Sequence, residues 1–414
     1  MVFSGISAVS FEVIRCSLPL YDRHRSTVAS NSYKEAVVVV AKSNGHLGFG
    51  ELAPLPMPFY EEQYLDGAQK VLTYLLSQLS RAFSAGKGFD LRSYREIVGR
   101  VRGWSSAKFA IDIALADLNG RIEGIGPFET LQRWCGANEV LYSISSSLAR
   151  LDRSFGVRDF IVPPQGTSVG DFASLTRKTL NPNSYRRIKI KVDASKYNDL
   201  SHFEVLARYI REVSPEFEVV IDFNETGPSK ELLESLLHES VSFFEAPYRV
   251  GSIEEGQRLF RDRSYRVAFD ESLKDDSRLI DFMGADLFDV AVLKPHRFGS
   301  IADLLKAIVR LTAFERPNGR GIGFYFGGMY DTPILRRLMA VLAALFPDSE
   351  ASDLGPDRDY FSAPILPSVV AVDQGLKVVG GVGLTGAFAP GREHTTLSLK
   401  IEDGYVQEVV RGGA

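Results

Sequence analysis

The 414-residue sequence has only two cysteines, no block of like charge and no long apolar run. Cys16 and Cys135 lie far apart and lack metal-ligand spacing, which argues against a disulfide framework or a zinc site and favours a reducing compartment. No segment approaches the roughly 20 apolar residues of a membrane span, and the N-terminus lacks a basic start followed by a long apolar stretch. We therefore expect a cytoplasmic protein without a membrane partner.

The composition is that of an ordered, water-soluble enzyme or binding protein. A formal net charge of -4, with no basic stripe, gives nothing to follow a phosphate backbone, so we expect no nucleic-acid partner. Hydrophobic residues at 45% supply ample core material. Because 414 residues exceed one ordinary core, we expect two domains or a large barrel with an attached domain.

The first 121 residues predict a small antiparallel sheet followed by helices. Three strand patterns, SAVSFEVIRCSL, EAVVVVAKS and LGFGE, lie between Ile6 and Glu51, with a tight turn at Asn44-Gly45. The polar stretch from Tyr21 to Ser32 predicts a mobile loop between the first two strands. From Glu61 to about Arg121, apolar residues recur at helical spacing.

From Val140 the pattern changes to repeated βα units. Nearly continuous apolar runs, typical of parallel strands buried on both faces, alternate with amphipathic stretches, and seven or eight such units indicate a closed barrel. From about Pro367, short Gly-rich pieces return, and we expect them to pack on the first domain. The expected domains are residues 1–138, 139–366 and 367–414. The runs are VLYSISSSL, RRIKIKVD, FEVVIDFN, VSFFEAPY, RVAFDESL, LFDVAVLKP and GIGFYFGGM.

Charged residues stand where these strands are expected to end. Functional side chains of parallel barrels project from the C-terminal strand ends. Taken singly, each of these residues has a commoner role as a helix cap or a solvated charge. Three carboxylates spaced 23 and 25 residues apart, about one βα unit, with lysines before and after, instead favour one site for a hard divalent cation. The residues are Lys189, Lys191, Asp222, Asn224, Glu245, Asp270, Glu271 and Lys294.

These motifs carry a resemblance to a known family. RIKIKV, VIDFNE, FFEAP, AFDES and VLKPHRFGS, in this order, resemble the metal and base motifs of the enolase superfamily, in its muconate lactonizing (muconate cycloisomerase) subgroup. The GFGE strand, the AIDIALADLNGR helix and the GFYFGGM strand extend the resemblance over most of the chain. It implies an α/β fold: a (β/α)7β TIM-like barrel with an α+β capping domain formed by the N-terminal region and the C-terminal segment.

The resemblance also implies roles for individual residues. Lys191 and Lys294 match the acid/base lysines, and a lysine at 294 without a following His-Asp pair separates the chain from the mandelate racemase subgroup. The expected cofactor is Mg2+, with Mn2+ as an alternative. The expected metal ligands are Asp222, Glu245 and Asp270. The polar positions that support them are Lys189, Asn224 and Glu271.

The chemistry explains why these residue types are needed. A proton next to a carboxylate is very weakly acidic, because its loss places a second negative charge on an anion, and a dication that binds the resulting enediolate offsets that cost. A lysine is a base only when neutral. Burial, the neighbouring Lys189 and the metal would each lower the pKa of Lys191, so we predict a depressed value.

Residues around this centre are candidates for holding the substrate, with core packing or a turn as the alternative for each. His296 and Arg297 either supply a cation for a second substrate carboxylate or lie in a solvated loop. Asp331 stands where related proteins carry glutamate, and Pro333 is an addition, which weakens any transfer of substrate specificity. The candidates are Ser143 and Ser145 on the first barrel strand, Tyr21, Met57, Phe59 and Tyr60 in the cap, and Gly328, Met329 and Asp331 after the seventh strand.

Several functions fit this centre. The KPHRFGS and GGM segments most resemble the o-succinylbenzoate synthase branch and its N-succinylamino acid racemase relatives, which favours proton abstraction followed by β-elimination. A racemase or epimerase of N-acyl amino acids or dipeptides and a muconate-type cycloisomerase are alternatives, and a non-catalytic barrel scaffold is a fourth. The expected partner is a small-molecule carboxylate. Relatives are commonly homodimers or octamers, so we expect a homo-oligomer.

Overall fold

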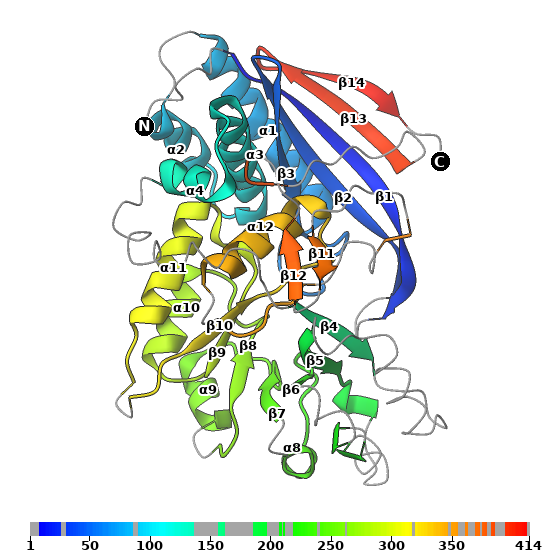
Figure 1. Cartoon of the computed structure of the whole chain (residues 1–414), viewed down its shortest axis with the longest axis vertical. Helices are drawn as coiled ribbons and strands as arrows, with labels where there is room; N and C mark the ends of the chain where they lie inside the picture. Colours follow the sequence, from blue (N-terminus) through cyan, green and yellow to red (C-terminus); the bar gives the residue numbers. More distant parts are fainter. Residues whose placement is uncertain are drawn as a thin grey trace.

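The first sheet joins segments from both ends of the chain (Figure 1). The computed structural model describes residues 8–25, 30–85, 90–135, 156–161, 185–196, 207–208, 210–211, 218–237, 241–260, 263–316, 319–346, 349–354, 361–362, 369–372, 375–378, 382–385 and 394–411. Five antiparallel strands run in the order β14-β13-β1-β2-β3. Their bounds are β1 Ser10–Arg25, β2 Ser30–Ser43, β3 His46–Leu52, β13 Thr395–Glu402 and β14 Tyr405–Arg411.

The predicted strands of this sheet are confirmed, but the predicted loop is wrong for Tyr21 to Arg25 and for Ser30 to Ser32, which belong to strands; residues 26–29 lie outside the described residues. β1 continues to Arg25 and β2 begins at Ser30, with Arg25 opposite Ser30 in the ladder. A polar stretch without alternation can extend a hairpin beyond the core because the ladder satisfies its backbone groups. The β2–β3 turn has the positive φ angles of a tight hairpin, 50° at Asn44 and 76° at Gly45.

Helices cover one face of this sheet, as the periodicity predicted. The long helix α3 is buried along most of its length and packs directly on β3. That approach depends on glycine, because a Cβ on Gly50 would lie 2.0 Å from Ala110 O. The helices are α1 Leu65–Ser84, α2 Leu91–Gly99, α3 Ser105–Glu123 and α4 Pro127–Cys135.

Seven parallel strands form the second sheet, in the order β10-β9-β8-β7-β6-β5-β4, which gives the chain the barrel wall of a TIM-like fold. β4 was not predicted, whereas the strand predicted from Val140 lies outside the described residues. Residues 349–354 lie beside β10 and are hydrogen-bonded to it. Glu350 N donates to Phe324 O (2.9 Å), and Asp353 N donates to Phe326 O (2.9 Å). The strands are β4 Gly156–Ile161, β5 Tyr185–Lys191, β6 Glu218–Asp222, β7 Val241–Glu245, β8 Val267–Phe269, β9 Val290–Leu293 and β10 Gly323–Phe326.

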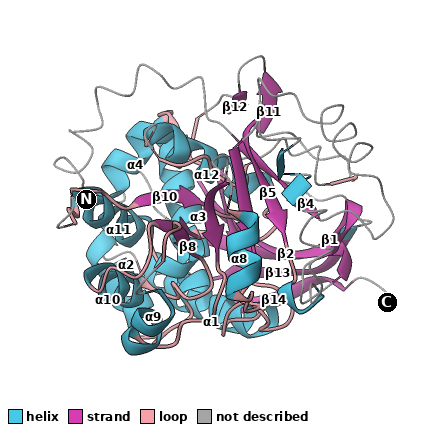
Figure 2. Ribbon diagram, turned by 90° about the horizontal axis from the view of Figure 1, so that it is seen from below, coloured by secondary structure: helices cyan, strands magenta, loops and turns pink. Residues whose placement is uncertain are grey.

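Helices follow the parallel strands, and Figure 2 shows α9, α10 and α11 grouped outside the strands. Among the described residues, the helix α12 and the hairpin of β11 and β12 complete the structure, and α12 contacts β3, β10 and the hairpin. The domain boundaries at 138 and 366 stay predictions. The remaining elements are η2 Ala194–Lys196, α8 Lys230–Leu236, α9 Ile253–Phe260, α10 Asp276–Gly284, η3 Pro295–Phe298, α11 Ile301–Ala313, α12 Pro333–Leu345, β11 Val369–Val372 and β12 Gly375–Val378.

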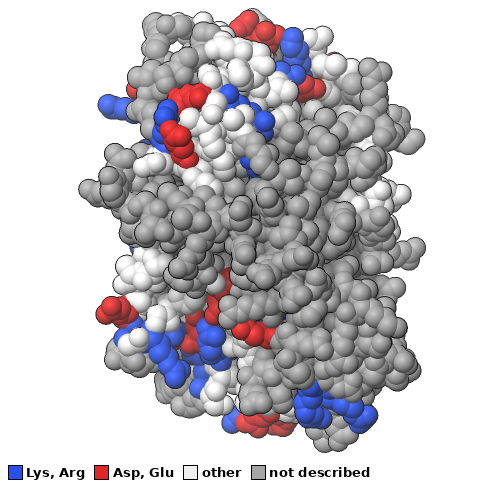
Figure 3. Space-filling model, viewed as in Figure 1, with Lys and Arg blue, Asp and Glu red and all other residues white. Residues whose placement is uncertain are grey.

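On the face in Figure 3, acidic and basic side chains lie close to one another. None of the helices that the structure describes has both the length and the hydropathy needed to cross a membrane.

Candidate active site

Alternation along the parallel strands brings charged side chains to one end of the barrel interior. A small apolar layer fills the interior below, with Val220, Phe243 and Tyr325 among its members. Asp222 comes two residues after Val220 and is paired in register with Glu245. Because successive side chains of a strand point to opposite faces, Asp222 lies on the same face as Val220, one layer higher.

Each of the three predicted metal ligands lies beside a lysine. Lys189 Nζ is 3.0 Å from Glu245 Oε1, and Lys191 Nζ is 3.7 Å from Asp222 Oδ2. Lys294 Nζ is 2.9 Å from Asp270 Oδ2. The structure therefore places at the strand ends, each carboxylate beside a lysine, the residues that the sequence assigned to five separate strands.

The three carboxylates are buried: Asp222 is 1% exposed, Glu245 0% and Asp270 5%. Burial raises the pKa of Glu245 well above its ordinary value, and the negative charges of Asp222 and Asp270 add to the effect against the opposing charge of Lys189. Burial would raise the pKa of Asp270 too, but Lys294 and Arg297 outweigh it and the pKa is lowered. The site thus holds concentrated, incompletely balanced negative charge.

The contact with Asp270 also shifts the pKa of Lys294, and it shifts it upward. Burial alone would lower the pKa of Lys294, but the attraction of Asp270 outweighs it and raises the pKa above the ordinary lysine value. The neighbouring carboxylate of Asp270 thus favours the protonated form of Lys294. The predicted depression of the Lys191 pKa stays a prediction.

Asn224 contacts both Asp222, one of the predicted ligands, and Glu271. Asn224 donates its backbone N–H to Asp222 Oδ1 (3.0 Å) and its side-chain amide to Glu271 Oε1 (3.1 Å). Its φ of 44° is left-handed, a conformation that non-glycine residues adopt at a cost and that clusters at functional sites. Burial, then Asp270, raises the pKa of Glu271 to about 8.

Two oxygens at this position are orphaned. Asn224 Oδ1 and Glu271 Oε2 are buried with no hydrogen-bond partner among the described residues. Buried polar atoms normally have a partner, so these two atoms indicate that a cation, a water or a ligand completes the site.

The donor set fits a hard divalent cation, although its present arrangement does not. Among the described residues, no group of three or more His, Cys, Asp or Glu side chains is gathered closely enough to hold a metal ion. The reason is visible in the ion pairs, because a lysine lies against each carboxylate. Buried carboxylates in excess, together with the orphaned oxygens, match the all-oxygen ligands that Mg2+ prefers.

Two further residues complete the network around Glu245, and the sequence analysis missed both. The Tyr325 hydroxyl donates a short hydrogen bond to Glu245 Oε2. Asp353 Oδ2 accepts a hydrogen bond from Lys189 Nζ at 2.6 Å. A tyrosine inside an apolar strand and an aspartate in a polar segment carry no distinguishing pattern, so only the fold reveals them.

The alternative of a solvated loop at His296 and Arg297 is wrong. Their exposures are only 2% and 4%. Arg297 Nη1 lies 3.0 Å from Asp270 Oδ1, and His296 Nε2 lies 3.0 Å from Glu61 Oε2. Burial would raise the pKa of Glu61, but His296, together with the charges of Arg297 and Lys294, outweighs it and lowers the pKa to about 2. Glu61 therefore connects the cap loop to η3.

The other residues predicted to contact the substrate differ in their distance from the centre and in their exposure. Tyr60 faces the centre, because Lys294 Nζ lies 5.7 Å from the middle of its ring. Met57 and Phe59 are 55% and 53% exposed, and their contact with a substrate stays a prediction. Tyr21 is described only as part of β1, and Ser143 and Ser145 lie outside the described residues.

The loop after β10 is held by the first domain. Lys34 Nζ donates to Met329 O at 2.9 Å, and Glu51 accepts a hydrogen bond from Thr332 N at 2.9 Å. Asp331 is 3% exposed and accepts from Met329 N at 3.2 Å, so it is turned toward its own loop. A Cβ on Gly328 would lie 2.6 Å from Asp331 Oδ2, which explains the glycine there.

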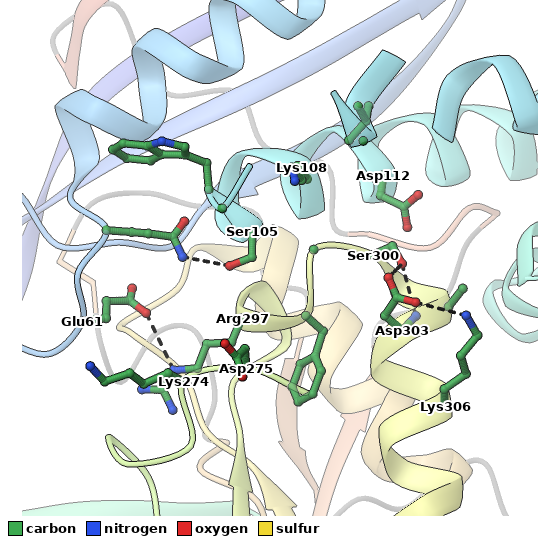
Figure 4. Close-up of a pocket in the computed structure, with 18 of the residues that line it drawn as sticks. Glu61, Ser105, Lys108, Asp112, Lys274, Asp275, Arg297, Ser300, Asp303 and Lys306 are labelled. Atoms are coloured by element: carbon green, nitrogen blue, oxygen red, sulfur yellow. Dashed lines mark hydrogen bonds and ion pairs between the residues drawn. The ribbon is translucent and has the colours of Figure 1, made fainter. Parts of the chain in front are cut away.

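A cavity of about 790 Å³ lies beside this centre, between α2 and α3 on one side and α10 and α11 on the other (Figure 4). Glu271 and Arg297 line it, whereas the predicted ligands Asp222 and Glu245 do not. Its charges are largely paired within the wall, as between Asp303 and Lys306 at 3.1 Å. The cavity therefore borders the strand ends and does not lie over them.

A parallel barrel with an attached sheet, and buried carboxylates and lysines at the C-terminal strand ends, define an α/β-barrel enzyme with a capping unit. Residues 171–387 match the model of the family described as enolase C-terminal domain-like. The chain belongs to this family, and the expected recognition and fold class are confirmed.

Two curated relatives match nearly the whole chain. An o-succinylbenzoate synthase from Listeria innocua is 21% identical, with 95% of each chain covered. An N-succinylamino acid racemase from an Amycolatopsis species is 23% identical, covering 94% of this chain and 96% of the relative. Such relatives are enzymes of the enolase superfamily, whose members are lyases, isomerases and racemases.

The fold is also that of a solved structure. A probable mandelate racemase from Alicyclobacillus acidocaldarius aligns with a TM-score of 0.77 and 22% identity, over 98% of this chain and 100% of that one. At this identity the likeness shows the fold alone.

Proposed function

We propose that this chain removes the α-proton of a small-molecule carboxylate in an enolase-type reaction that depends on Mg2+. The observation that carries the proposal is the pairing of Lys191 with Asp222 and of Lys294 with Asp270 at the same end of the barrel. Two lysines beside separate carboxylates of one buried cluster supply an acid and a base for one reaction.

Asp222, Glu245 and Asp270 would hold the metal ion. When bound, Mg2+ would supply the positive charge that offsets the second negative charge of a deprotonated carboxylate. Mn2+, which takes similar oxygen ligands, is the alternative cofactor. The orphaned Asn224 Oδ1 and Glu271 Oε2 support this assignment, since polar atoms without partners mark an incomplete site.

The chain's own residues then divide the remaining work. Lys294, protonated beside Asp270, is placed to donate a proton or to assist a leaving group. Lys191 lies on another strand, and its more distant carboxylate partner, at 3.7 Å, makes it the better candidate for the base. Tyr60, beside Lys294, would help to exclude water.

For the step after proton abstraction we propose β-elimination, as the synthase relative's name suggests. Racemisation or epimerisation of an N-acyl amino acid or a dipeptide is the second candidate, because the racemase relative matches the same length of chain. A muconate-type cycloisomerase is a third. A non-catalytic scaffold is disfavoured, because a binding module has no need of buried lysines beside buried carboxylates.

Product analysis separates these candidates. Metal-free protein is incubated with Mg2+ and either β-hydroxy carboxylates, such as the o-succinylbenzoate synthase substrate, or single enantiomers of N-acyl amino acids. Elimination gives a dehydrated product, and racemisation gives the opposite enantiomer. Both must stop in Lys191→Ala and Lys294→Ala. Turnover that persists in both variants, or without any divalent metal, would contradict the proposal.

A further inference from the structure

Lys189 lies between two carboxylates, of which one belongs to the proposed metal ligands. Its Nζ is 3.0 Å from Glu245 Oε1 and 2.6 Å from Asp353 Oδ2. The lysine is only 3% exposed, so water does not share in neutralising its charge. Asp353 is thus a second counter-ion for Lys189.

Both oxygens of Glu245 are already engaged. Lys189 contacts Oε1, and the Tyr325 hydroxyl donates to Oε2. A metal ion at Glu245 must compete with these contacts. Leaving a buried lysine without its partner is strongly destabilising, because the charge is then buried without compensation. A second carboxylate that stays with the lysine removes that penalty.

The backbone of Asp353 is fixed to the barrel sheet, which keeps its side chain beside Lys189. Its backbone N–H donates to Phe326 O at 2.9 Å, which holds it against β10. Its Oδ2 lies 3.6 Å from the place of a Cβ on Gly327, where glycine leaves space beside the carboxylate.

We propose that Asp353 is a positioning residue: it keeps the charge of Lys189 neutralised and so leaves Glu245 available to the metal ion. The inference rests on the proposed function, because it takes Glu245 as a metal ligand. Without the Asp353 charge, Lys189 pairs with Glu245 alone and competes with the metal. Removing the Tyr325 hydroxyl, which donates to the other carboxylate oxygen, should have the opposite effect on metal binding, because it frees Glu245 Oε2.

The test is a Mn2+ titration of the metal-free full chain, with free Mn2+ measured by electron paramagnetic resonance. Asp353→Asn should raise the dissociation constant about tenfold or more. Asp353→Glu, which restores the charge, should bind within about threefold of wild type, and Tyr325→Phe should bind at least as tightly as wild type. If Asp353→Asn does not fold, Asp353→Ser takes its place.

Glu225→Gln is the matched control, since Glu225 is a carboxylate that Ser272 contacts at 2.9 Å. It should weaken binding less than about threefold. Equal weakening by Glu225→Gln would mean a general charge effect and overturn the inference, as would wild-type affinity in Asp353→Asn or equal weakening in Tyr325→Phe. Wild-type protein that binds Mn2+ no better than Asp270→Asn would instead overturn the metal site, and this inference with it.

Discussion

The ammonium group of Lys294 lies 2.9 Å from Asp270 Oδ2, and both side chains are more than nine-tenths buried. Lys294 is the proposed proton donor and Asp270 a proposed metal ligand. The carboxylate of Asp270 would therefore interact with both the lysine charge and the metal ion. The proposed activity follows from this relationship and from the similar pair of Lys191 and Asp222.

Metal should stabilise the protein through these carboxylates. Addition of Mg2+ to chelator-treated protein should raise the free energy of unfolding, by about 2.7 kcal/mol at a hundred times the dissociation constant. Thermal unfolding followed by circular dichroism measures the change. Asp222→Asn should abolish it, whereas Asp66→Asn, an exposed aspartate paired with Arg15, should keep it. Equal stabilisation of both variants would place the metal elsewhere.

Glu61 and Glu62, two neighbouring glutamates of the cap loop, should make very different contributions to the free energy of unfolding. Glu61 is buried against His296 and Arg297, so Glu61→Gln should cost about 2–4 kcal/mol of stability. Glu62 is 82% exposed in its pair with Lys274, so Glu62→Gln should cost less than about 1 kcal/mol. Urea unfolding of both variants gives the comparison, and similar losses would show that the Glu61 contacts do not hold the loop.

Glu51 should make stability depend on pH. Burial, then Asp331, raises its pKa from 4.5 to about 7. The folded state therefore holds a proton that the unfolded state releases, and stability present below pH 4.5 is lost as the pH rises toward 7, by roughly 3 kcal/mol. Unfolding of wild type and Glu51→Gln from pH 4.5 to 7.5 checks the difference. Parallel curves for the two proteins would refute it.

The effect of a Gly→Ala substitution on stability should depend on the space available for a Cβ atom. A Cβ on Gly50 would lie 2.0 Å from Ala110 O, so Gly50→Ala should separate β3 from α3 and cost about 3 kcal/mol. A Cβ on Gly99, at the end of α2, meets nothing within 4 Å. Gly99→Ala should leave stability unchanged or raise it by up to about 1 kcal/mol. Unfolding midpoints test the pair, and equal effects would contradict the packing argument.

Local patterns predicted most of the strands and helices, because burial on both faces or on one stripe leaves a periodic record in the sequence. The spacing of Asp222, Glu245 and Asp270 predicted for the same reason that they stand at the same end of the barrel, since equal βα units return the chain to that end. Their convergence on one metal ion stays a prediction. The errors lie where no local pattern exists. The stretch from Tyr21 to Ser32 is polar, and yet its described parts continue the ladder, with His24 opposite Asn31 and Arg25 opposite Ser30.

Partners distant in the chain could not be predicted either. Glu61 and His296 are 235 residues apart, and Lys189 and Asp353 are 164 apart. Each pair is set by how the cap loop or residues 349–354 pack against the barrel, and the sequence around Glu61 and around Asp353 resembles an ordinary solvated segment. The buried state of His296 follows from that packing and from nothing adjacent to it.

Solvent deuterium exchange into each enantiomer of a bound carboxylate tests the central claim most directly. Lys191 and Lys294 should act on opposite faces of the substrate, so wild type with Mg2+ in D2O should exchange the α-proton. Lys191→Ala should lose exchange with one enantiomer and Lys294→Ala with the other, as nuclear magnetic resonance would show. Undiminished exchange of both enantiomers in either variant would contradict the assignment of these two lysines.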